Sequence, residues 1–158
     1  WTSVFRAVHR IPTVGYVLGE NRKKLKPEFV GQPEAVIRRA AQSGVNVSEM
    51  MEVPELAFCG DTCIDVLERE SLVRQARILI MEVTFLDERV SVQSARENGH
   101  VHLDEVIQRQ ELFENEHILF THFSSRYTGN DIVRILDERL PDALKGRVSP
   151  LLPSAPWD

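Results

Sequence analysis

Three short apolar runs stand out in the pattern of hydrophobic and polar residues along the chain. Residues 54–62, 76–84 and 118–120 are bounded by polar or turn-forming residues and have the length of buried strands. The run at 76–84, "ARILIMEVT", is the most apolar stretch of the sequence. We therefore expect it to be a central strand of a sheet.

Weaker alternation near the start of the chain predicts a hairpin. Residues 3–8 alternate between apolar and polar side chains, "IPTVG" then forms a bend, and a second strand follows at 16–18. This arrangement places His9 at the tip of the hairpin. The turn-rich segment "NRKKLKPEFVGQ" is then expected to form a basic insertion at about residues 20–32.

Helical periodicity fills most of the segments between these strands. Apolar stripes, a proline at a first turn and glycines at helix ends favour helices at 33–41, 63–70, 91–99, 102–115 and 130–140. Strands that alternate with helices indicate an α/β or α+β sandwich built on one continuous sheet. No internal repeat or interdomain linker is evident, so residues 1–158 are expected to form a single domain.

The charge balance limits what the protein can bind. The 158 residues include 19 basic and 24 acidic side chains, which give a net charge of -5. This composition excludes a generally basic nucleic-acid-binding surface, so any contact with phosphate has to come from a local patch. No apolar run is long enough to span a bilayer, and no membrane insertion is expected.

The two cysteines, Cys59 and Cys63, flank the short segment "GDT". They do not make the disulfide framework of a secreted protein, so reduced thiols and an intracellular compartment are expected. We interpret Cys59 as a small core residue and Cys63 as a helix-start residue rather than as metal ligands. The chain begins at Trp1 with neither an initiator methionine nor a presequence pattern, which indicates a processed or partial product.

Polar side chains of metal-ligand type follow three of the predicted strands. His9 comes after "FRAV", Asp61 after "ELAFCG" and His122 after "ILFT", and His100 follows a glycine in a loop. Residues that end several strands are expected to meet at the carboxyl edge of an open α/β sheet. Histidine nitrogen and carboxylate oxygen are donors that zinc takes. Each residue taken alone also has a structural interpretation, as a strand-end or turn residue.

Five ordered sequence blocks resemble those of one enzyme family. "HRIPTVGY", "FCGDT", "MEVTFLDE", "SARENGHVHLDEV" and "THFSSRYT" occur in the order and spacing of ribonuclease Z, the tRNA 3′-processing endonuclease of the metallo-β-lactamase superfamily. They are most similar to its short plant or algal form, and the resemblance runs from Phe5 to about Val148. It implies the second half of a metallo-β-lactamase αβ/βα fold. It also implies a zinc-dependent endoribonuclease that removes 3′ trailers from precursor tRNA.

The resemblance further implies roles for individual residues. His9 matches a ligand of one zinc ion, Asp61 matches an aspartate that bridges two zinc ions, and His122 matches a ligand of the second. His100 matches a histidine that protonates the leaving oxygen, supported by the acidic residue that aligns with Glu82. Such a site lowers the pKa of a metal-bound water to about 7 for in-line attack on phosphorus. A histidine can then give a proton to the leaving 3′ oxygen.

Two departures from the family pattern affect these expectations. Most bacterial and animal members have "HEAT" where this chain has "MEVT" at 81–84, a change that plant-type members share. The family signature "HxHxDH", which supplies the remaining ligands, does not occur in this sequence. We therefore interpret the chain as a carboxyl-terminal half that is inactive alone. It is expected to need a companion amino-terminal half, or a homodimer partner, against the strand at 76–83.

Further residues are candidates for substrate contact. Arg126 lies where the family has a phosphate-contacting arginine, with an ordinary surface charge as the alternative. His102 either orients His100 or is a solvated residue at a helix start. The densest basic run falls in the insertion, where family members project an arm that grips tRNA, and a solvated loop is its alternative. This run consists of Arg22, Lys23, Lys24 and Lys26.

Two functions from different classes remain open at this point. One is the endoribonuclease, with precursor tRNA as its partner and two zinc ions in the complete site; hydrolysis of another phosphodiester or a small ester is a variant of it. The other is a ribonuclease Z-derived module without catalysis that serves as a scaffold or subunit of a larger assembly. The expected location is the cytoplasm, the nucleus or an organelle such as the chloroplast or mitochondrion of a plant or alga.

Overall fold

The computed structural model of the chain describes residues 1–152, which form one six-stranded mixed sheet. The strands are hydrogen-bonded to one another in the order in which they occur in the sequence. The first and second strands pair in an antiparallel way, and so do the second and third. The third to the sixth strands are all parallel to one another. Their bounds are β1 Thr2–Arg6, β2 Val14–Leu25, β3 Ser48–Phe58, β4 Ile78–Glu82, β5 His117–Thr121 and β6 Val148–Pro150.

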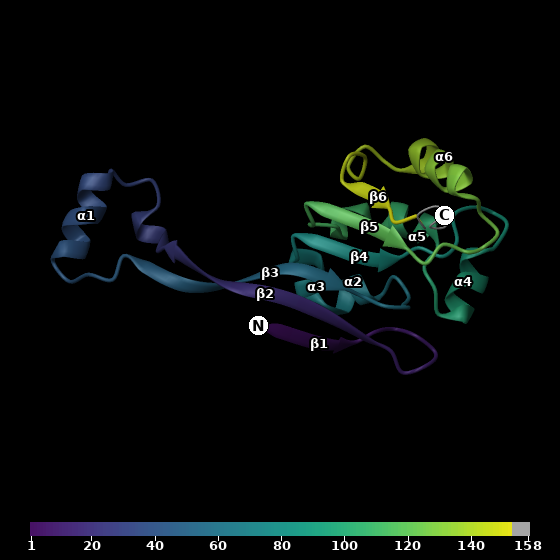
Figure 1. Cartoon of the computed structure of the whole chain (residues 1–158), viewed down its shortest axis with the longest axis horizontal. Coiled ribbons are helices and arrows are strands. Elements are labelled where there is room, and N and C mark those ends of the chain that lie inside the picture. The colour runs from purple at the N-terminus through teal and green to yellow at the C-terminus, as the bar shows by residue number, and fades with distance from the viewer. Residues whose placement is uncertain (153–158) are drawn as a thin grey trace, which may run out of the picture.

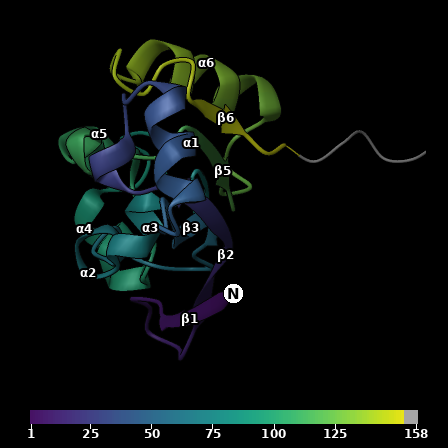
Figure 2. The ribbon, with the colours of Figure 1, turned by 90° about the vertical axis from the view of Figure 1, so that its left-hand side faces the viewer.

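The helices of the described chain are α1 Glu34–Gln42, α2 Val66–Arg69, α3 Ser71–Gln75, α4 Val92–Asn98, α5 Leu103–Gln108 and α6 Gly129–Arg139, with 3₁₀ helices η1 Pro27–Phe29 and η2 Gln110–Leu112. Parallel neighbours require crossover connections, which these helices supply. In Figures 1 and 2, α2 to α5 lie behind one face of the sheet, and α6 lies beyond β6. None of them is long and apolar enough to cross a membrane.

The structure confirms the mixed α/β class and most of the predicted elements, with shifted ends. The run at 76–84 forms β4, which lies between β3 and β5 in the sheet. The helix predicted at 63–70 is shorter, Val66–Arg69, because Glu70 takes an extended conformation, and a second short helix, α3, follows it. The helix predicted at 102–115 ends at Gln108 and is followed by η2. Local periodicity thus predicted where elements form better than where they end.

One prediction about the start of the chain was wrong. The second strand does not stop at Leu18; β2 continues to Leu25 and pairs with β3 back to Ser48. The basic run therefore lies mainly on a strand, not in a turn-rich loop. Pairing with a distant strand overrides the weak local preference of charged residues, which the sequence pattern could not reveal.

The extended parts of β2 and β3 form an arm, residues 20–55, that projects from the core and carries η1 and α1 at its tip (Figure 1). No residue of η1 or α1 is buried. Six basic side chains in the arm are matched by six acidic ones, so it has no net charge. At its base, where the register shifts, Glu55 pairs with Arg22 at 2.7 Å and with Arg77, just before β4, at 3.3 Å.

The two faces of the sheet differ in their exposure. On the side covered by helices, Leu79, Met81 and Phe120 are fully buried. On the other side, cross-strand register aligns apolar side chains across five strands, from β1 to β5. No described segment covers them, and Tyr16 and Phe58 are 42% and 43% exposed. We call this surface the bare face; it comprises Val4, Tyr16, Leu18, Leu56, Phe58, Ile78, Ile80 and Leu119.

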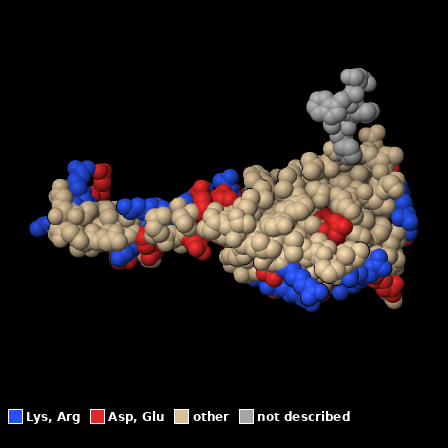
Figure 3. Space-filling model, turned by 60° about the horizontal axis from the view of Figure 1, so that its bottom comes forward, with Lys and Arg blue, Asp and Glu red and all other residues tan. Residues whose placement is uncertain are grey.

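The bare face has the character of a contact surface. Figure 3 looks obliquely at this side of the molecule, where the core is mainly uncharged and most acidic and basic side chains lie on the arm and at the margins. Ile78 and Ile80 are half-buried by their neighbours alone. Apolar surfaces of this kind on a single chain mark sites of association. That another segment packs against the central strand stays a prediction.

We predict that the isolated chain self-associates through the bare face. Replacing both Tyr16 and Leu18 with Lys would require burial of unpaired charges in the contact, and should weaken self-association by about 10-fold or more. Sedimentation velocity over a concentration series measures the effect. Val133→Lys, at a site on α6 that is 50% exposed, is the matched control and should associate like the parent. Undiminished association of the double variant would contradict the prediction.

Candidate functional site

The carboxyl ends of β3, β4 and β5 meet at one edge of the sheet. Asp61 lies just after β3, Glu82 is the last residue of β4, and His122 follows β5. His9 and His100 reach the same place from loops: the ring centroid of His100 is 5.3 Å from that of His9 and 5.2 Å from that of His122. The structure therefore brings together the five residues that the sequence singled out for metal binding and proton transfer.

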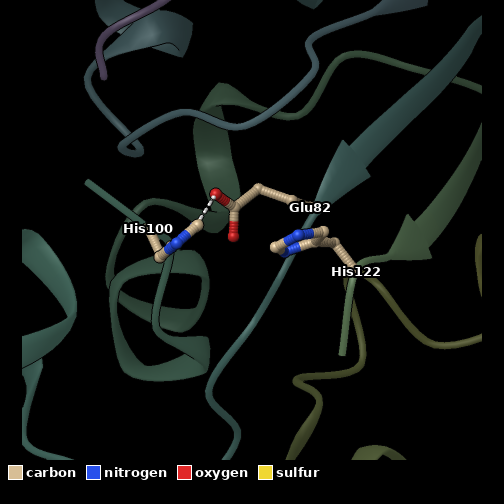
Figure 4. Close-up of side chains that lie close together, drawn as sticks. All are labelled: Glu82, His100 and His122. Atoms are coloured by element: carbon tan, nitrogen blue, oxygen red, sulfur yellow. Dashed lines mark hydrogen bonds and ion pairs between the residues drawn. The ribbon is translucent and has the colours of Figure 1, made fainter. Parts of the chain in front are cut away.

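Glu82 is a buried carboxylate of this cluster, and its carboxylate group is hydrogen-bonded to the His100 ring (Figure 4). Its Oε1 atom accepts hydrogen bonds from the backbone N–H of Thr62 at 3.0 Å and from Nδ1 of His100 at 2.7 Å. Its Oε2 atom accepts from the Thr84 hydroxyl at 2.6 Å and from the backbone N–H of Val101 at 3.2 Å. These four donors occupy the accepting capacity of one carboxylate.

The Thr84 hydroxyl links Glu82 to His122. Its Oγ1 atom lies 2.9 Å from Nδ1 of His122. A hydroxyl has a single hydrogen, and Thr84 donates it to Glu82, so this oxygen must accept the second hydrogen bond. His122 therefore carries a proton on Nδ1, and its Nε2 atom is left free.

His9 and His100 are oriented in the same way. Nδ1 of His9 donates to the carbonyl oxygen of Gly99 at 2.9 Å, and Nδ1 of His100 donates to Glu82. Gly99 leaves no room for a side chain, because an added Cβ would collide with the His9 ring. A histidine whose Nδ1–H is held by an oxygen and whose Nε2 is free is the usual form of a metal ligand or acid–base group.

His122 has an unusual backbone conformation. With φ at 59°, it is the one non-glycine residue of the described chain in the left-handed region. That conformation costs on the order of 1 kcal/mol and persists where surrounding contacts impose it. Here it places Nε2 of His122 3.6 Å from Oδ1 of Asp61. The strand ends at His122 because the backbone leaves the extended conformation at this residue.

His9, His122 and Asp61 offer imidazole nitrogens and a carboxylate, which are donors of the kind that zinc takes. Among the described residues, the three whose atoms lie within 4.8 Å of one another, close enough for a shared ion, are Glu82, His100 and His122. However, Glu82 already accepts four hydrogen bonds, and Nδ1 of His100 is one of the donors. Its hydrogen-bonding thus argues for Glu82 as a support of His100 rather than as a ligand.

The predicted substrate-contacting residues lie outside this cluster. Arg126 follows β5 on an exposed loop, where its Nη1 donates to the Ser124 hydroxyl at 3.2 Å. On β2, side chains alternate between faces, so Lys23 points to the opposite side of the arm from Arg22 and Lys24. Arg22 is also paired with acidic neighbours. The basic run, which ends with Lys26 just after β2, is therefore divided rather than gathered into one patch.

His102 is neither solvated nor in contact with the cluster. It is buried as the N-cap of α5, where Nδ1 accepts from the backbone N–H of Asp104 at 3.1 Å and Nε2 donates to the carbonyl oxygen of Asp87 at 3.1 Å. Glu105 completes the capping box by accepting from the His102 backbone N–H. The expectation of a solvated residue was wrong, because the His102 side chain is buried and caps the N-terminus of α5.

Both cysteines are free thiols in the core. Burial raises the pKa of the Cys59 thiol to about 12, and the nearby Glu82 carboxylate adds to this effect. Burial also raises the pKa of Cys63. Since the thiolate is the form that binds metals and attacks electrophiles, neither residue is suited to these roles.

Thr62 and Thr84 are site residues that the sequence did not reveal. Both hold Glu82 in place, and Thr84 also orients His122. The one sequence signal is the hydroxyl two residues after Glu82 in "MEVT", at the end of an apolar run. Such a pattern becomes informative only once the neighbouring strand is known to end in a histidine.

We predict that Thr84 sets the tautomer of His122. Thr84→Val keeps the shape but removes the acceptor, so neutral His122 should lose its preference for the Nδ1–H form, whereas Thr84→Ser should keep it. Two-dimensional ¹H–¹⁵N NMR of the metal-free chain with neutral imidazoles distinguishes the tautomers. His117, an exposed histidine on β5, should be unchanged in both variants. An unaltered His122 signal in Thr84→Val would disprove the assignment.

In sequence, the chain is similar to plant tRNase Z proteins. It is 41% identical over 146 residues to tRNase Z TRZ1 of Arabidopsis thaliana, which covers 91% of this chain and 52% of that relative. It is 35% identical over 149 residues to the chloroplastic tRNase Z TRZ2 of the same plant, covering 93% of this chain and 42% of that relative. No protein-family model matches the chain.

Solved structures show the same fold. The metallo-β-lactamase fold protein YhfI of Bacillus subtilis superposes with a TM-score of 0.54 over 94% of this chain and 45% of that chain, at 12% identity. A long form RNase Z from yeast superposes with a TM-score of 0.50 over 80% of this chain and 14% of that chain, at 19% identity. The chain has the metallo-β-lactamase fold and is homologous to plant tRNase Z proteins over 91% of its length, and it spans about half the length of the curated relatives it matches.

Proposed function

We propose that the chain is the carboxyl-terminal half of a zinc-dependent endoribonuclease that removes 3′ trailers from precursor tRNA and leaves a 3′ hydroxyl. The observation that carries the proposal is the His100–Glu82 pair, held within one cluster with the free donors of Asp61 and His122. A supported proton donor beside metal-ligand atoms is what hydrolysis of a phosphodiester requires. The kinship with tRNase Z proteins supports precursor tRNA as the substrate.

His9, Asp61 and His122 are the residues of this chain that would hold zinc. When bound, two zinc ions supply a hydroxide for in-line attack and neutralise charge on the phosphate. Asp61 would contribute a carboxylate with two oxygens as ligand atoms. His9 and His122 each present Nε2 with the proton held on Nδ1.

His100 serves as the acid in this proposal. It acts as the imidazolium, whose charge the buried Glu82 carboxylate stabilises at 2.7 Å. The proton moves from Nε2 to the leaving 3′ oxygen, while the Nδ1 proton stays in the hydrogen bond to Glu82. Thr62, Thr84 and Val101 hold Glu82 fixed during this step.

A companion amino-terminal half would complete both the fold and the site. The three zinc-type donors of this chain are too few for two zinc ions. A pocket of about 170 Å³ lies at the margin of the bare face, and its walls include Phe58, Asp61 and His122. A segment packed on that face would therefore reach the site. A companion is favoured over a second copy of this chain, because a copy would repeat these donors without adding the missing signature.

Arg126 and the arm are the proposed contacts with RNA. Arg126 is exposed near His122 and suits a phosphate through its planar fork. Among the arm residues, Lys23, Lys24 and Lys26 form no ion pair in the described structure, whereas Arg22 is bound to Glu20 and Glu55. The three lysines are thus the stronger candidates for backbone phosphates.

A second function, a non-catalytic scaffold derived from tRNase Z, is favoured by one observation. Three residues of the described chain, His9, Asp61 and His122, are proposed to hold zinc, and without further ligands two zinc sites would be incomplete. The two functions differ in whether the assembled protein cleaves RNA.

The first test is cleavage of a precursor tRNA by this chain joined to its companion half, with mapping of the new 3′ end. Asp61→Ala should abolish trailer release and lower the zinc content, because a proposed zinc ligand is lost. Asp65→Ala, which removes an acidic side chain that pairs with Arg96 instead, is the matched control and should remain active. If Asp61→Ala releases the trailer as well as the parent does, the endoribonuclease proposal is wrong. If the parent releases no trailer, the scaffold function is favoured.

The second test separates the acid from the ligands. His100→Ala should lower turnover by about 10² to 10⁴ while the zinc content is unchanged. His117→Ala, which removes an exposed histidine away from the site, should leave turnover unaffected. Loss of zinc from His100→Ala would show instead that His100 is a ligand.

A further inference from the structure

A larger pocket of about 590 Å³ lies next to the proposed site, between the loop after β5 and the start of α6. Thr121 and His122 line both this pocket and the smaller one that contains Asp61 and Glu82. The two spaces therefore adjoin at His122. A ligand whose phosphate lies by the proposed zinc ligands would have its next chemical group at the mouth of the larger pocket.

The walls of the larger pocket are apolar with a few hydroxyl groups. Phe123, Ile132 and Leu151 provide apolar surface, and Ser124 and Ser125 provide hydroxyls. No side chain that lines it is Lys, Arg, Asp or Glu. These walls do not suit a phosphate or a metal ion. They suit a flat group with an apolar face and polar edges, which is the chemistry of a nucleobase.

We propose that this pocket binds the base of the nucleotide on the 3′ side of the cut, the first nucleotide of the trailer. This inference rests on the proposed function. In that reaction the leaving 3′ oxygen belongs to the nucleotide on the 5′ side and receives its proton from His100. The pocket is built from residues from Thr121 onward and not from the loop that carries His100, so it faces the nucleotide that retains the phosphate.

Arg126 supports this placement. Its guanidinium donates to the hydroxyl of Ser124, a wall residue, at 3.2 Å, and its side chain is exposed. A base in the pocket thus has a cation next to it for the phosphate that continues the trailer. In a nucleotide, the base and its 5′ phosphate are attached to the same ribose and so lie close together. The two pockets are likewise adjacent, because they share the walls formed by Thr121 and His122.

The test uses the assembled enzyme and removes either the base from the RNA or the Phe123 side chain from the pocket. A precursor RNA with an abasic first trailer nucleotide should be cleaved with kcat/KM lower by about 5- to 100-fold, the range for loss of one stacked base. Phe123→Ala should lower kcat/KM for the intact RNA to a similar degree. This variant should cleave the intact and the abasic RNA with nearly equal kcat/KM. Val133→Ala, an exposed position on α6 outside this pocket, should behave like the parent. Equal cleavage of both RNAs by the parent, or full discrimination by Phe123→Ala, would overturn the proposal.

Direct binding tests the pocket even if no RNA is cleaved. In ¹H–¹⁵N NMR of this chain, adenosine 5′-monophosphate should shift the amides of Phe123 and Ile132, whereas ribose 5-phosphate, which has no base, should not. Phe123→Ala should weaken adenosine binding by about 5-fold or more. Equal shifts with both probes would show that the pocket does not serve a base.

Discussion

A carboxylate shielded from water needs a donor for each accepting position, and Glu82 draws its donors from three different loops. The backbone N–H groups of Thr62 and Val101 fix its two oxygens, and the side chains of Thr84 and His100 complete the set. Loss of any one donor would leave a buried charge partly unsatisfied, which is costly. The loops after β3, β4 and α4 are thereby held in a single arrangement, and the cluster depends on it.

The direction of these hydrogen bonds also explains the orientation of the histidines. His122, Thr84, Glu82 and His100 form one chain of donors and acceptors in which each proton has a single possible position. Networks of this kind specify one geometry, because no side chain can rotate without leaving another one without its hydrogen-bond partner. A site assembled from separate loops acquires in this way the rigidity of a single element.

The sequence predicted the central strand and the polar strand ends well, for a physical reason. The apolar side chains on both faces of β4 and the abrupt change to polar residues after β3 and β5 are recorded in local order, so Asp61 and His122 could be placed at one edge. The roles of Thr84 and His102 could not be predicted, because a hydroxyl or an imidazole finds its partner only after distant loops meet. The length of β2 was missed for the same reason: its partner strand, β3, lies on the far side of α1 in the sequence.

The position of Glu55 at the root of the arm has a mechanical consequence. This side chain pairs with Arg22 in the arm and with Arg77, which leads into β4, and β4 ends at Glu82. The base of the arm is thus connected to one end of β4, and the buried Glu82 carboxylate lies at the other end of this strand. A displacement of the arm would therefore act on these two ion pairs and, through Arg77, on the start of the strand that carries Glu82 at its end.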